Sequence, residues 1–281
     1  LHPELISNLA RIKKAAAVVN AQSGNLAVGK KDAIVQACDE IVAGHFHEAF
    51  IVDAIQGGAG TSANMNANEV IANRAIEILG GRKGDYRIVH PNDDVNLCQS
   101  TNDVFPTAGK MTVLKLLPEL IAELEKLESA LGDKAEAFAG VIKMGRTQMQ
   151  DAVPTTLGRT FKAYRSFVKR DIRHLMSAAE EMKSLNLGGT AIGNAINATP
   201  EYLENITAFV SKEAGMTFIQ AEDLFDATQN VDGFVRVSAA IKTAAVNLSK
   251  MSNDLRLLSS GPRAGIGEIN LPAKQNGSSI M

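Results

Sequence analysis

The sequence contains no tryptophan, and aromatic residues make up only 5% of its 281 residues. It has just two cysteines, Cys38 and Cys98, which lie in neither a CxxC pair nor a histidine-rich cluster. Cysteines placed in this way do not form a disulfide framework or a zinc site. We therefore expect two buried or half-buried thiols, and core packing that depends on aliphatic and small side chains.

An excess of charge is also missing, because 29 basic residues face 31 acidic ones and the formal net charge is −2. This balance gives no electrostatic reason for binding nucleic acid or an anionic membrane. No apolar run approaches the roughly 20 residues that a membrane span needs, and no charged-then-apolar leader is visible. We expect a soluble, cytoplasmic protein.

Several familiar fingerprints are absent as well. There is no metal-ligand cluster, no Walker or Rossmann glycine motif, and no Gly-x-Ser-x-Gly elbow. Nothing alternates at period two over enough residues to build a sheet of any size. We therefore expect no metal and no cofactor, and a protein without a substantial sheet.

The first third of the chain shows helical periodicity. Apolar residues at three- and four-residue spacing predict helices over about 4–22 and 31–42, with Lys13 and Lys14 on another face of the first. A third helix is expected over about 64–79, and a short extended piece over 86–89. Residues 1–98 are thus expected to form a smaller, mostly helical N-terminal domain.

Three later segments carry longer apolar repeats, and the last of them follows a 3, 4, 3, 4 spacing over three heptads. The residues are Leu114, Leu117, Ile121, Leu124, Leu127 and Leu131; Leu157, Phe161, Tyr164, Val168, Ile172, Leu175, Ala179 and Met182; and Phe234, Val237, Ile241, Ala244, Leu248, Met251, Leu255 and Leu258. A helix over about 226–258 is on the order of 50 Å long. Helices of that length need long partners, so we predict an all-α fold with a long antiparallel helix bundle over 99–281.

Polar residues gather on the glycine-rich turns between these helices. A glycine run at 57–60 before a helix suits an anion, because backbone N–H groups and the helix dipole meet there. Five polar residues at 99–103 precede another helix, where N-capping requires only one of them. We take the candidate set to be Thr61, Ser62, Asn64, Ser100, Thr101, Asn102, Thr147, Gln148, Ser278 and Ser279. Neutral donors of this kind suit a small anion with several carboxylate oxygens.

Five segments, in order, resemble the signature motifs of the aspartase/fumarase superfamily. They are GGAGTSANMN at 57–66, HPNDDVN at 90–96, QSTND at 99–103, GRTQMQDA at 145–152 and GSSIM at 277–281. The resemblance implies a reversible anti-elimination that releases ammonia, water or an amine from a succinyl group and gives fumarate. It also implies a homotetramer of long helices in which each active site is built by three subunits.

The resemblance further assigns roles to individual residues. The substrate's carboxylate becomes an enediolate-like species during the reaction, and hydrogen-bond donors must meet that charge where it develops. The residues that match the family's carboxylate-holding positions are Thr61, Ser100, Thr101 and Ser279, with Asn102 beside them. Ser278 matches the catalytic base, whose alkoxide would need stabilisation by backbone amides of its loop.

Details of the sequence favour ammonia as the leaving group. Gln148 stands where the hydratase branch typically has histidine, and Ala198 and Thr199 stand where hydratases show Thr-His. Without that histidine the obvious general acid for expelling hydroxide is missing, whereas ammonia leaves as an already protonated amine. The sequence therefore resembles the aspartase branch more than the class II fumarate hydratases.

Two alternatives remain open from the sequence. His90, Asn92 and Asp93 resemble a second dicarboxylate site described for class II fumarases, although His90 is equally suited to be a turn residue with a satisfied ring. The superfamily also contains lens crystallins, so a non-catalytic structural bundle is the second alternative. The donor set on the turns is the feature that distinguishes an enzyme from such a bundle.

The ends of the sequence suggest a fragment. It begins with Leu1 rather than methionine, and the signature run stops at Met281. In the family this run continues into Pro-x-Lys-x-Asn, whose Lys and Asn bind the second carboxylate. We therefore expect the 281-residue chain alone to be inactive.

Overall fold

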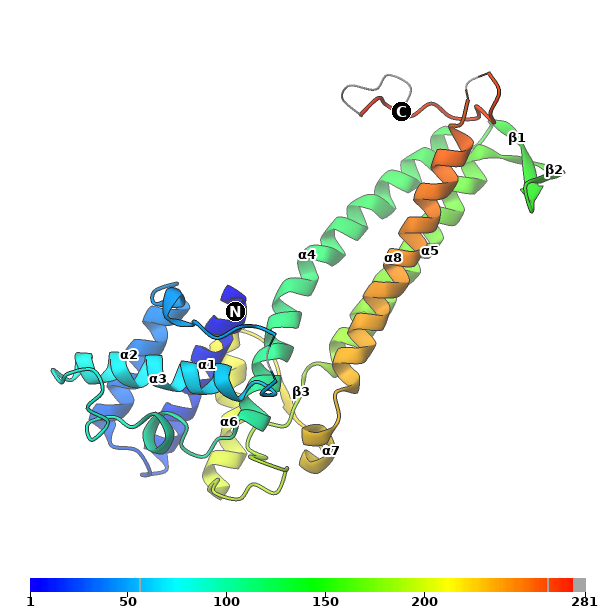
Figure 1. Ribbon diagram of the computed structural model, residues 1–281. Helices are drawn as coiled ribbons and strands as arrows, with labels where there is room; N and C mark the ends of the chain where they lie inside the picture. The colour runs from blue at the N-terminus through cyan, green and yellow to red at the C-terminus, as the bar shows by residue number, and fades with distance from the viewer. Residues whose placement is uncertain (56, 262, 275–281) are drawn as a thin grey trace. The chain divides into compact units, whose positions relative to one another are not determined.

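The computed structural model describes residues 1–55, 57–261 and 263–274 (Figure 1). They form two compact units, of which the first comprises Leu1–Pro118 and Ala179–Phe234 and the second Glu119–Ala178 and Val235–Met281. Each unit is assembled from two separate stretches of the chain. The predicted domains 1–98 and 99–281 are contiguous instead, and their boundary stays a prediction.

The first unit is built around α1 (Pro3–Gln22), which packs against α2 (Val28–Val42), α3 (Thr61–Ile78) and α6 (Pro200–Ala214) (Figure 1). Twelve residues of α1 are buried, and they lie on more than one face of the helix, so α1 can pack against several helices at once. The three predicted N-terminal helices are confirmed, each beginning one to three residues earlier than the sequence pattern indicates.

Short elements complete the first unit. They are η1 (His47–Ala49), the π-turn η2 (Pro91–Val95), the two-residue parallel pair β3 (Ser184–Leu185) and β4 (Ile219–Gln220), and α7 (Leu224–Gln229). The predicted extended piece at 86–89 is wrong. Hydrogen bonds from Tyr86 N to Gly84 O and from Ile88 N to Asp85 O fold this stretch into turns.

Helix α4 (Thr101–Ala137) begins within the polar motif at 99–103 and contains Pro106 and Pro118. A proline within a helix lacks the N–H that would bond to the carbonyl four residues earlier. Here that carbonyl, Asn102 O, accepts a hydrogen bond from Asn186 Nδ2 at 3.0 Å. The side chain of Asn186 thus replaces the missing donor and lets the helix begin at the polar motif.

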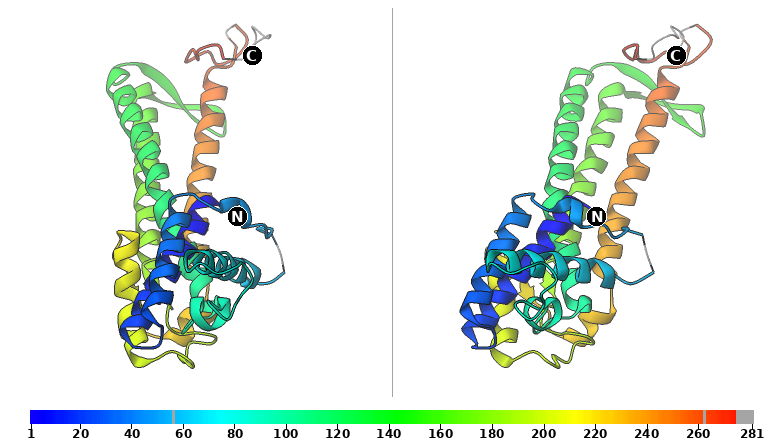
Figure 2. Two further views of the ribbon diagram at one scale, coloured as in Figure 1. Left: turned by 90° about the vertical axis from the view of Figure 1, so that its left-hand side faces the viewer. Right: turned by 60° about the vertical axis from the view of Figure 1, so that its left-hand side comes forward.

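The second unit is a bundle of three long helices: the later part of α4, α5 (Leu157–Glu181) and α8 (Asp232–Leu258) (Figure 2). The contacts Tyr164 to Asp254 and Asp171 to Asn247 show that α5 and α8 run in opposite directions. Residue numbers along α4 also fall as those of α5 rise, since Gly132 faces Arg165 and Gly158 faces Ala135. The predicted all-α fold with a long antiparallel bundle is confirmed.

Two details of the bundle differ from the prediction. Helix α8 begins at Asp232 rather than near 226, because Asp223 caps a separate short helix, α7, which ends at Gln229. The sequence analysis also missed a β-hairpin between α4 and α5, formed by β1 (Ile142–Thr147) and β2 (Gln150–Thr156). Its strands are too short and too exposed to show a period-two pattern.

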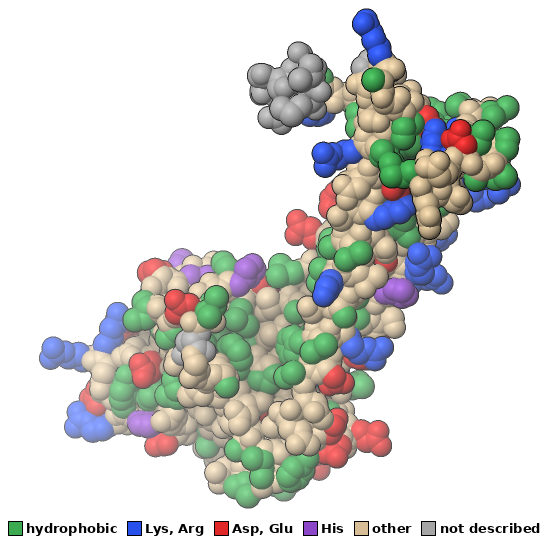
Figure 3. Space-filling view, turned by 45° about the vertical axis from the view of Figure 1, so that its right-hand side comes forward, with side chains coloured by type: hydrophobic (Ala, Val, Ile, Leu, Met, Phe, Trp, Pro, Cys, Tyr) green, Lys and Arg blue, Asp and Glu red, His purple; other side chains and the backbone are tan. Residues whose placement is uncertain are grey.

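The apolar repeat of α8 is only half covered within the chain. Val237, Ala244, Met251 and Leu258, at seven-residue spacing, are buried, whereas Ile241 between them is 42% exposed. Figure 3 shows hydrophobic side chains at the surface of the second unit, where Val246 is 60% exposed. Among the described residues, no helix has both the length and the hydropathy that a membrane span demands.

Candidate active site

The motifs at 57–66 and 99–103 adjoin each other, because the N-termini of α3 and α4 meet. Gly60, the residue before α3, has φ +88°, and a Cβ atom there would lie 2.4 Å from the ring of Phe105 on α4. Asn64 Nδ2, in the first turns of α3, donates to Thr101 Oγ1 at 3.1 Å. Glycine is therefore needed at position 60 both for its backbone conformation and for the close approach of the two helices.

The first turn of α4 is closed by a reciprocal cap. Asn102 N donates to Ser100 Oγ at 3.2 Å, and Ser100 N donates to Asp103 Oδ1 at 2.9 Å. The arrangement is similar to a capping box, with aspartate in place of glutamate and with the backbone donor at the second rather than the third helical residue. The cap uses Ser100 and Asp103, so the hydroxyl of Thr101 and the amide of Asn102 serve other contacts.

The hydroxyls of Ser100 and Thr101 are both arranged as donors. Each hydroxyl oxygen already accepts a hydrogen bond from a protein N–H, from Asn102 N and Asn64 Nδ2 respectively. A hydroxyl has one proton to give, and here that proton remains available for an acceptor outside these two bonds. The partial positive charge at the two helix N-termini favours an anion as that acceptor.

The loop over 186–191 is fastened to the same turn of α4. Asn102 Nδ2 donates to Ala191 O at 2.7 Å, and Asp103 Oδ2 accepts from Gly188 N at 3.1 Å and Thr190 N at 3.0 Å. Burial raises the pKa of Asp103 to about 6, although these backbone donors oppose the rise. The buried Asp103 side chain thus holds the loop over 186–191 beside the first turn of α4.

Lys13 is buried next to this arrangement, which corrects the prediction that it lies on a different face of its helix from the apolar residues. It is 0% exposed, and Nζ donates to Asn96 Oδ1 at 2.7 Å. Burial lowers the pKa of Lys13 to about 7, while the charge of Asp103 acts in the opposite direction. The signal was in the sequence, because Lys13 follows Leu9 by four residues and therefore shares its buried face.

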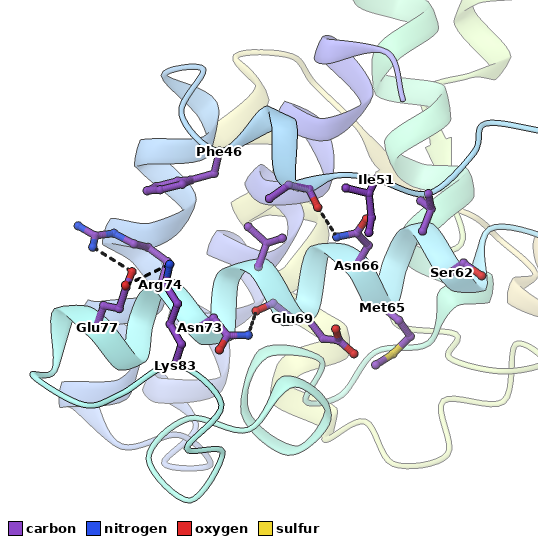
Figure 4. A pocket seen from close by; sticks show the side chains of 13 residues that line it. Phe46, Ile51, Ser62, Met65, Asn66, Glu69, Asn73, Arg74, Glu77 and Lys83 are labelled. Carbon is purple, nitrogen blue, oxygen red and sulfur yellow. Dashed lines mark hydrogen bonds and ion pairs between the residues drawn. The ribbon is translucent and has the colours of Figure 1, made fainter.

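Ser62 and Asn64 lie on different faces of α3. Asn64 is 1% exposed and faces the start of α4, whereas Ser62 borders a surface cavity of about 680 Å³ along the helix (Figure 4). Met65 also lines this cavity, as does Arg74, which is paired with Glu77 at 3.4 Å. The structure therefore brings Thr101 together with Asn64 and does not place Ser62 beside them.

His90 acts as a cap in this structure. Its Nδ1 accepts hydrogen bonds from Asn92 N at 3.2 Å and Asp93 N at 3.1 Å, at the start of η2. The neutral imidazole therefore carries its proton on Nε2. The side chains of Asn92 and Asp93 are exposed, and the second dicarboxylate site at these three residues stays a prediction.

Two further candidate residues, Thr147 and Gln148, belong to the second unit. Thr147 and Gln148 are exposed at the tip of the hairpin, where Gln148 and Met149 adopt φ values of 47° and 64°. A two-residue turn with both φ values positive is typical of type I′ hairpins and is strained for residues other than glycine, asparagine or aspartate. Ser278 and Ser279 lie outside the described residues.

Glu268 connects the segment after α8 to the hairpin, a link that the sequence analysis missed. Arg146 Nη1 donates to Glu268 Oε1 at 2.6 Å, and Lys143 Nζ lies 2.8 Å from Oε2. Burial alone would raise the pKa of Glu268, but the bonds from Lys143 and Arg146 lower it. Residues 145–148 thus include Arg146, which holds the segment that follows α8 through Glu268.

No group of three His, Cys, Asp or Glu side chains suited to a metal occurs in the described ranges.

Comparison with known proteins gives consistent matches over the whole chain. The lyase family model matches residues 2–281. Aspartate ammonia-lyases from Bacillus subtilis strain 168 and Helicobacter pylori strain J99 are each 52% identical, over all of this chain and over 59% and 60% of their own lengths. The chain thus spans about three fifths of the length of these relatives.

Solved structures agree with the sequence matches. A fumarate lyase:delta crystallin from Brucella melitensis superposes with a TM-score of 0.95 at 50% identity, covering 99% of this chain and 61% of that one. A class II fumarase from Schistosoma mansoni superposes with a TM-score of 0.93 at 35% identity, covering 100% of this chain and 62% of that one. Both likenesses extend over the two compact units.

Proposed function

The chain belongs to the lyase family, whose model matches residues 2–281, and from this we propose that the protein catalyses the reversible elimination of ammonia from L-aspartate to give fumarate. The observation that carries the proposal is the paired donor arrangement at the start of α4, where Ser100 and Thr101 each keep a hydroxyl proton to give. The names of relatives that are 52% identical support aspartate as the substrate.

In the proposed mechanism a base removes a proton from the carbon next to one carboxylate, which then carries a second negative charge. Thr61, Ser100, Thr101 and Ser279 are proposed to hold this carboxylate, with Asn102 beside them. Hydrogen bonds aimed at a developing charge stabilise a transition state more than a ground state. Ser278 is proposed as the base, and the amine leaves as ammonia without a separate general acid.

Substrate contacts from the second unit are proposed for Thr147 and Gln148. Their support is the strained, exposed hairpin turn, because backbone strain in a native protein is often retained where a side chain has a function. Ser62 and Asn64 were also predicted to contact substrate. Burial of Asn64 favours an indirect role instead, through its hydrogen bond to Thr101.

We also propose that the protein works as a homotetramer in the cytoplasm, with each active site shared between subunits. The support is the unpaired half of the α8 repeat together with exposed apolar residues of the hairpin, such as Ile142 at 79% and Met149 at 68%. Exposed apolar surface of this kind typically marks an interface between protein chains.

A fumarate hydratase is the second candidate function, favoured by the likeness to a class II fumarase at 35% identity. The two functions differ in the leaving group, and this chain has Gln148 and Thr199 where a histidine would supply a general acid for hydroxide. A structural bundle without activity is the third, since a neighbour's name includes delta crystallin.

The assay that tests the proposal follows fumarate by its ultraviolet absorbance. The purified full-length protein is given L-aspartate, L-malate and argininosuccinate in separate reactions, and we expect turnover of aspartate only. Turnover of malate in place of aspartate would contradict the choice of leaving group, and turnover of none would favour the structural bundle. The chain of residues 1–281 alone is expected to be inactive, because it spans about three fifths of its relatives.

A further inference from the structure

We propose that Lys13, Asn96 and Asn64 form a positioning relay that fixes the Thr101 hydroxyl as a hydrogen-bond donor to the substrate carboxylate. The inference rests on the proposed function, because it concerns the same carboxylate. It adds residues from α1, α3 and the turn after η2, none of which needs to touch the substrate.

The relay begins at Lys13, whose position fixes the amide orientation of Asn96. When protonated, Lys13 Nζ has only protons to give, and it lies 2.7 Å from Asn96 Oδ1. The other end of that amide, Asn96 Nδ2, donates to Gln99 O at 3.2 Å. A flipped Asn96 would place two donors together at Lys13 and two acceptors together at Gln99, so only the observed orientation is favourable.

Asn96 in turn fixes Asn64. Asn96 Oδ1 accepts a second hydrogen bond, from Asn64 Nδ2 at 3.2 Å, and the same nitrogen donates to Thr101 Oγ1 at 3.1 Å. Both amide protons of Asn64 are therefore committed, one to each acceptor. A flipped Asn64 would face Asn96 Oδ1 with an acceptor, which that oxygen repels.

Thr101 is the last member of the chain. Because its oxygen receives a proton from Asn64, the hydroxyl group cannot satisfy Asn64 by donating and keeps its own proton for another acceptor. With a flipped Asn64 the opposite would hold, since Thr101 would then donate inward and present only lone pairs outward. A carboxylate substrate would be repelled by such a hydroxyl.

One feature of Asn64 is unfavourable for stability. Its Oδ1 is buried and has no hydrogen-bond partner in the described part of the chain. A buried acceptor without a partner destabilises a fold. The orientation of the Asn64 amide therefore satisfies Asn96 and Thr101, which accept its two hydrogen bonds, and leaves its own oxygen without a partner in the described part of the chain.

Asn68 provides a matched control for Asn64. It lies four residues further along α3, is 0% exposed, and also has a buried Oδ1 without a partner in the described ranges. Its Nδ2 contacts the sulfur of Met65 at 3.5 Å and, among the described residues, bonds neither Asn96 nor Thr101, so it takes no part in the relay. Asn64→Asp and Asn68→Asp thus introduce the same change in equally buried places.

The first experiment compares these two variants in the full-length protein. A carboxylate at position 64 offers no proton to Thr101 and accepts the Thr101 proton instead. We expect kcat/KM for aspartate to fall about 100-fold, as for the loss of one transition-state donor, with a matching loss of affinity for succinate, an unreactive dicarboxylate. Asn68→Asp should stay within about threefold of wild type on both measures, with a similar change in thermal midpoint.

A second pair tests the start of the relay. Lys13→Met removes the donor that orients Asn96, and we expect kcat/KM and succinate affinity to fall about tenfold, as for the loss of an orienting hydrogen bond. Lys14→Met is its control, because Lys14 is paired with Asp39 and Glu213 and not with Asn96. Equal effects of Lys13→Met and Lys14→Met, or of the two asparagine variants, would overturn the relay and leave only a role in folding.

The binding measurement separates this inference from the proposed function. If the wild-type protein forms no fumarate from aspartate yet binds succinate by calorimetry, the proposed function fails and the relay is judged by succinate affinity alone. If the wild-type protein does neither, both proposals fail. Activity of Asn64→Asp at the wild-type level would contradict the relay while leaving the proposed function intact.

Discussion

The hydroxyl groups at this site can donate to a ligand because their oxygens already accept hydrogen bonds from the protein. Ser100 Oγ receives a backbone N–H and Thr101 Oγ1 receives an amide N–H, so both hydroxyl protons point elsewhere. Each such hydroxyl therefore needs a neighbouring polar group that donates a hydrogen bond to its oxygen and does not itself contact the substrate. At the residue scale this explains why Asn64, expected to touch substrate, is buried instead.

Gly60 allows a direct test of how closely α3 and α4 must approach. Replacement by alanine meets two penalties, a positive φ of about 1–2 kcal/mol and a clash with Phe105 of about 1–3 kcal/mol. Gly80→Ala, at the other end of α3, is the control, because its φ is +78° but its added Cβ would meet nothing within 4 Å.

We therefore expect Gly60→Ala to lower the free energy of unfolding by about 1–3 kcal/mol more than Gly80→Ala does. Urea unfolding monitored by circular dichroism measures both. Equal losses would mean that the Phe105 ring moves aside at no cost, and the close approach of the helices would then lose its importance.

At the scale of elements, the segment after α8 depends on a few polar contacts. Ser260 Oγ accepts from Ile266 N at 3.1 Å, Glu268 N donates to Leu258 O at 2.8 Å, and the Glu268 carboxylate pairs with Lys143 and Arg146 of β1. The described residues of this segment, 259–261 and 263–274, have little apolar burial. Its position should therefore be sensitive to the charge of Glu268.

Glu268→Gln should loosen this segment, because an amide can donate and cannot replace a carboxylate between two cations. Arg263 and Lys274 are exposed and offer trypsin two cleavage sites there. We expect trypsin to cleave the variant about three to ten times faster than wild type at these sites, since local opening controls such cleavage.

Glu128→Gln is the matched control for this change. Its side chain is 19% exposed against 16% for Glu268, and it pairs with Arg165 within the bundle. The same rate of cleavage in both variants would show that the segment is held by something other than Glu268. A faster rate for Glu268→Gln alone would support the anchor.

Prolines and turns limited what could be predicted about individual elements. Pro106 lies inside α4, and Asn186, 84 residues after Asn102 in the sequence, supplies the missing donor to Asn102 O. The hairpin at 142–156 was missed because most of its residues are exposed on both faces and show no alternation. The first feature depends on a contact between residues far apart in the sequence, and the second leaves no trace in the hydrophobic pattern.

At the scale of the whole molecule, the exposed apolar residues of α8 are the surface through which we propose that copies of the chain associate. Val246→Glu places a charge on this surface, and a buried charge without a partner strongly disfavours association. We expect the full-length variant to elute as a smaller species than wild type in size-exclusion chromatography with light scattering. Lys169→Glu, an exposed polar position on α5, is the control and should not change the assembly.

Dissociation should also reduce activity if the active site is shared between subunits. A Val246→Glu protein that remains folded by circular dichroism, yet is small and inactive, would support both self-assembly and a shared site. An assembly of unchanged mass would contradict the role of this surface. A small but fully active variant would instead show that one subunit carries a complete site.

The sequence by itself determined the helical class, the long antiparallel bundle and the family, because helical periodicity and short polar motifs are local properties of the chain. Only the tertiary structure decided which polar residues meet. Lys13, Asn64, Asn96 and Thr101 are separated by up to 88 residues, and their hydrogen bonds depend on how α1, α3 and α4 pack. Periodicity specifies the face of a helix, whereas the direction of a hydrogen bond depends on its partner across the fold.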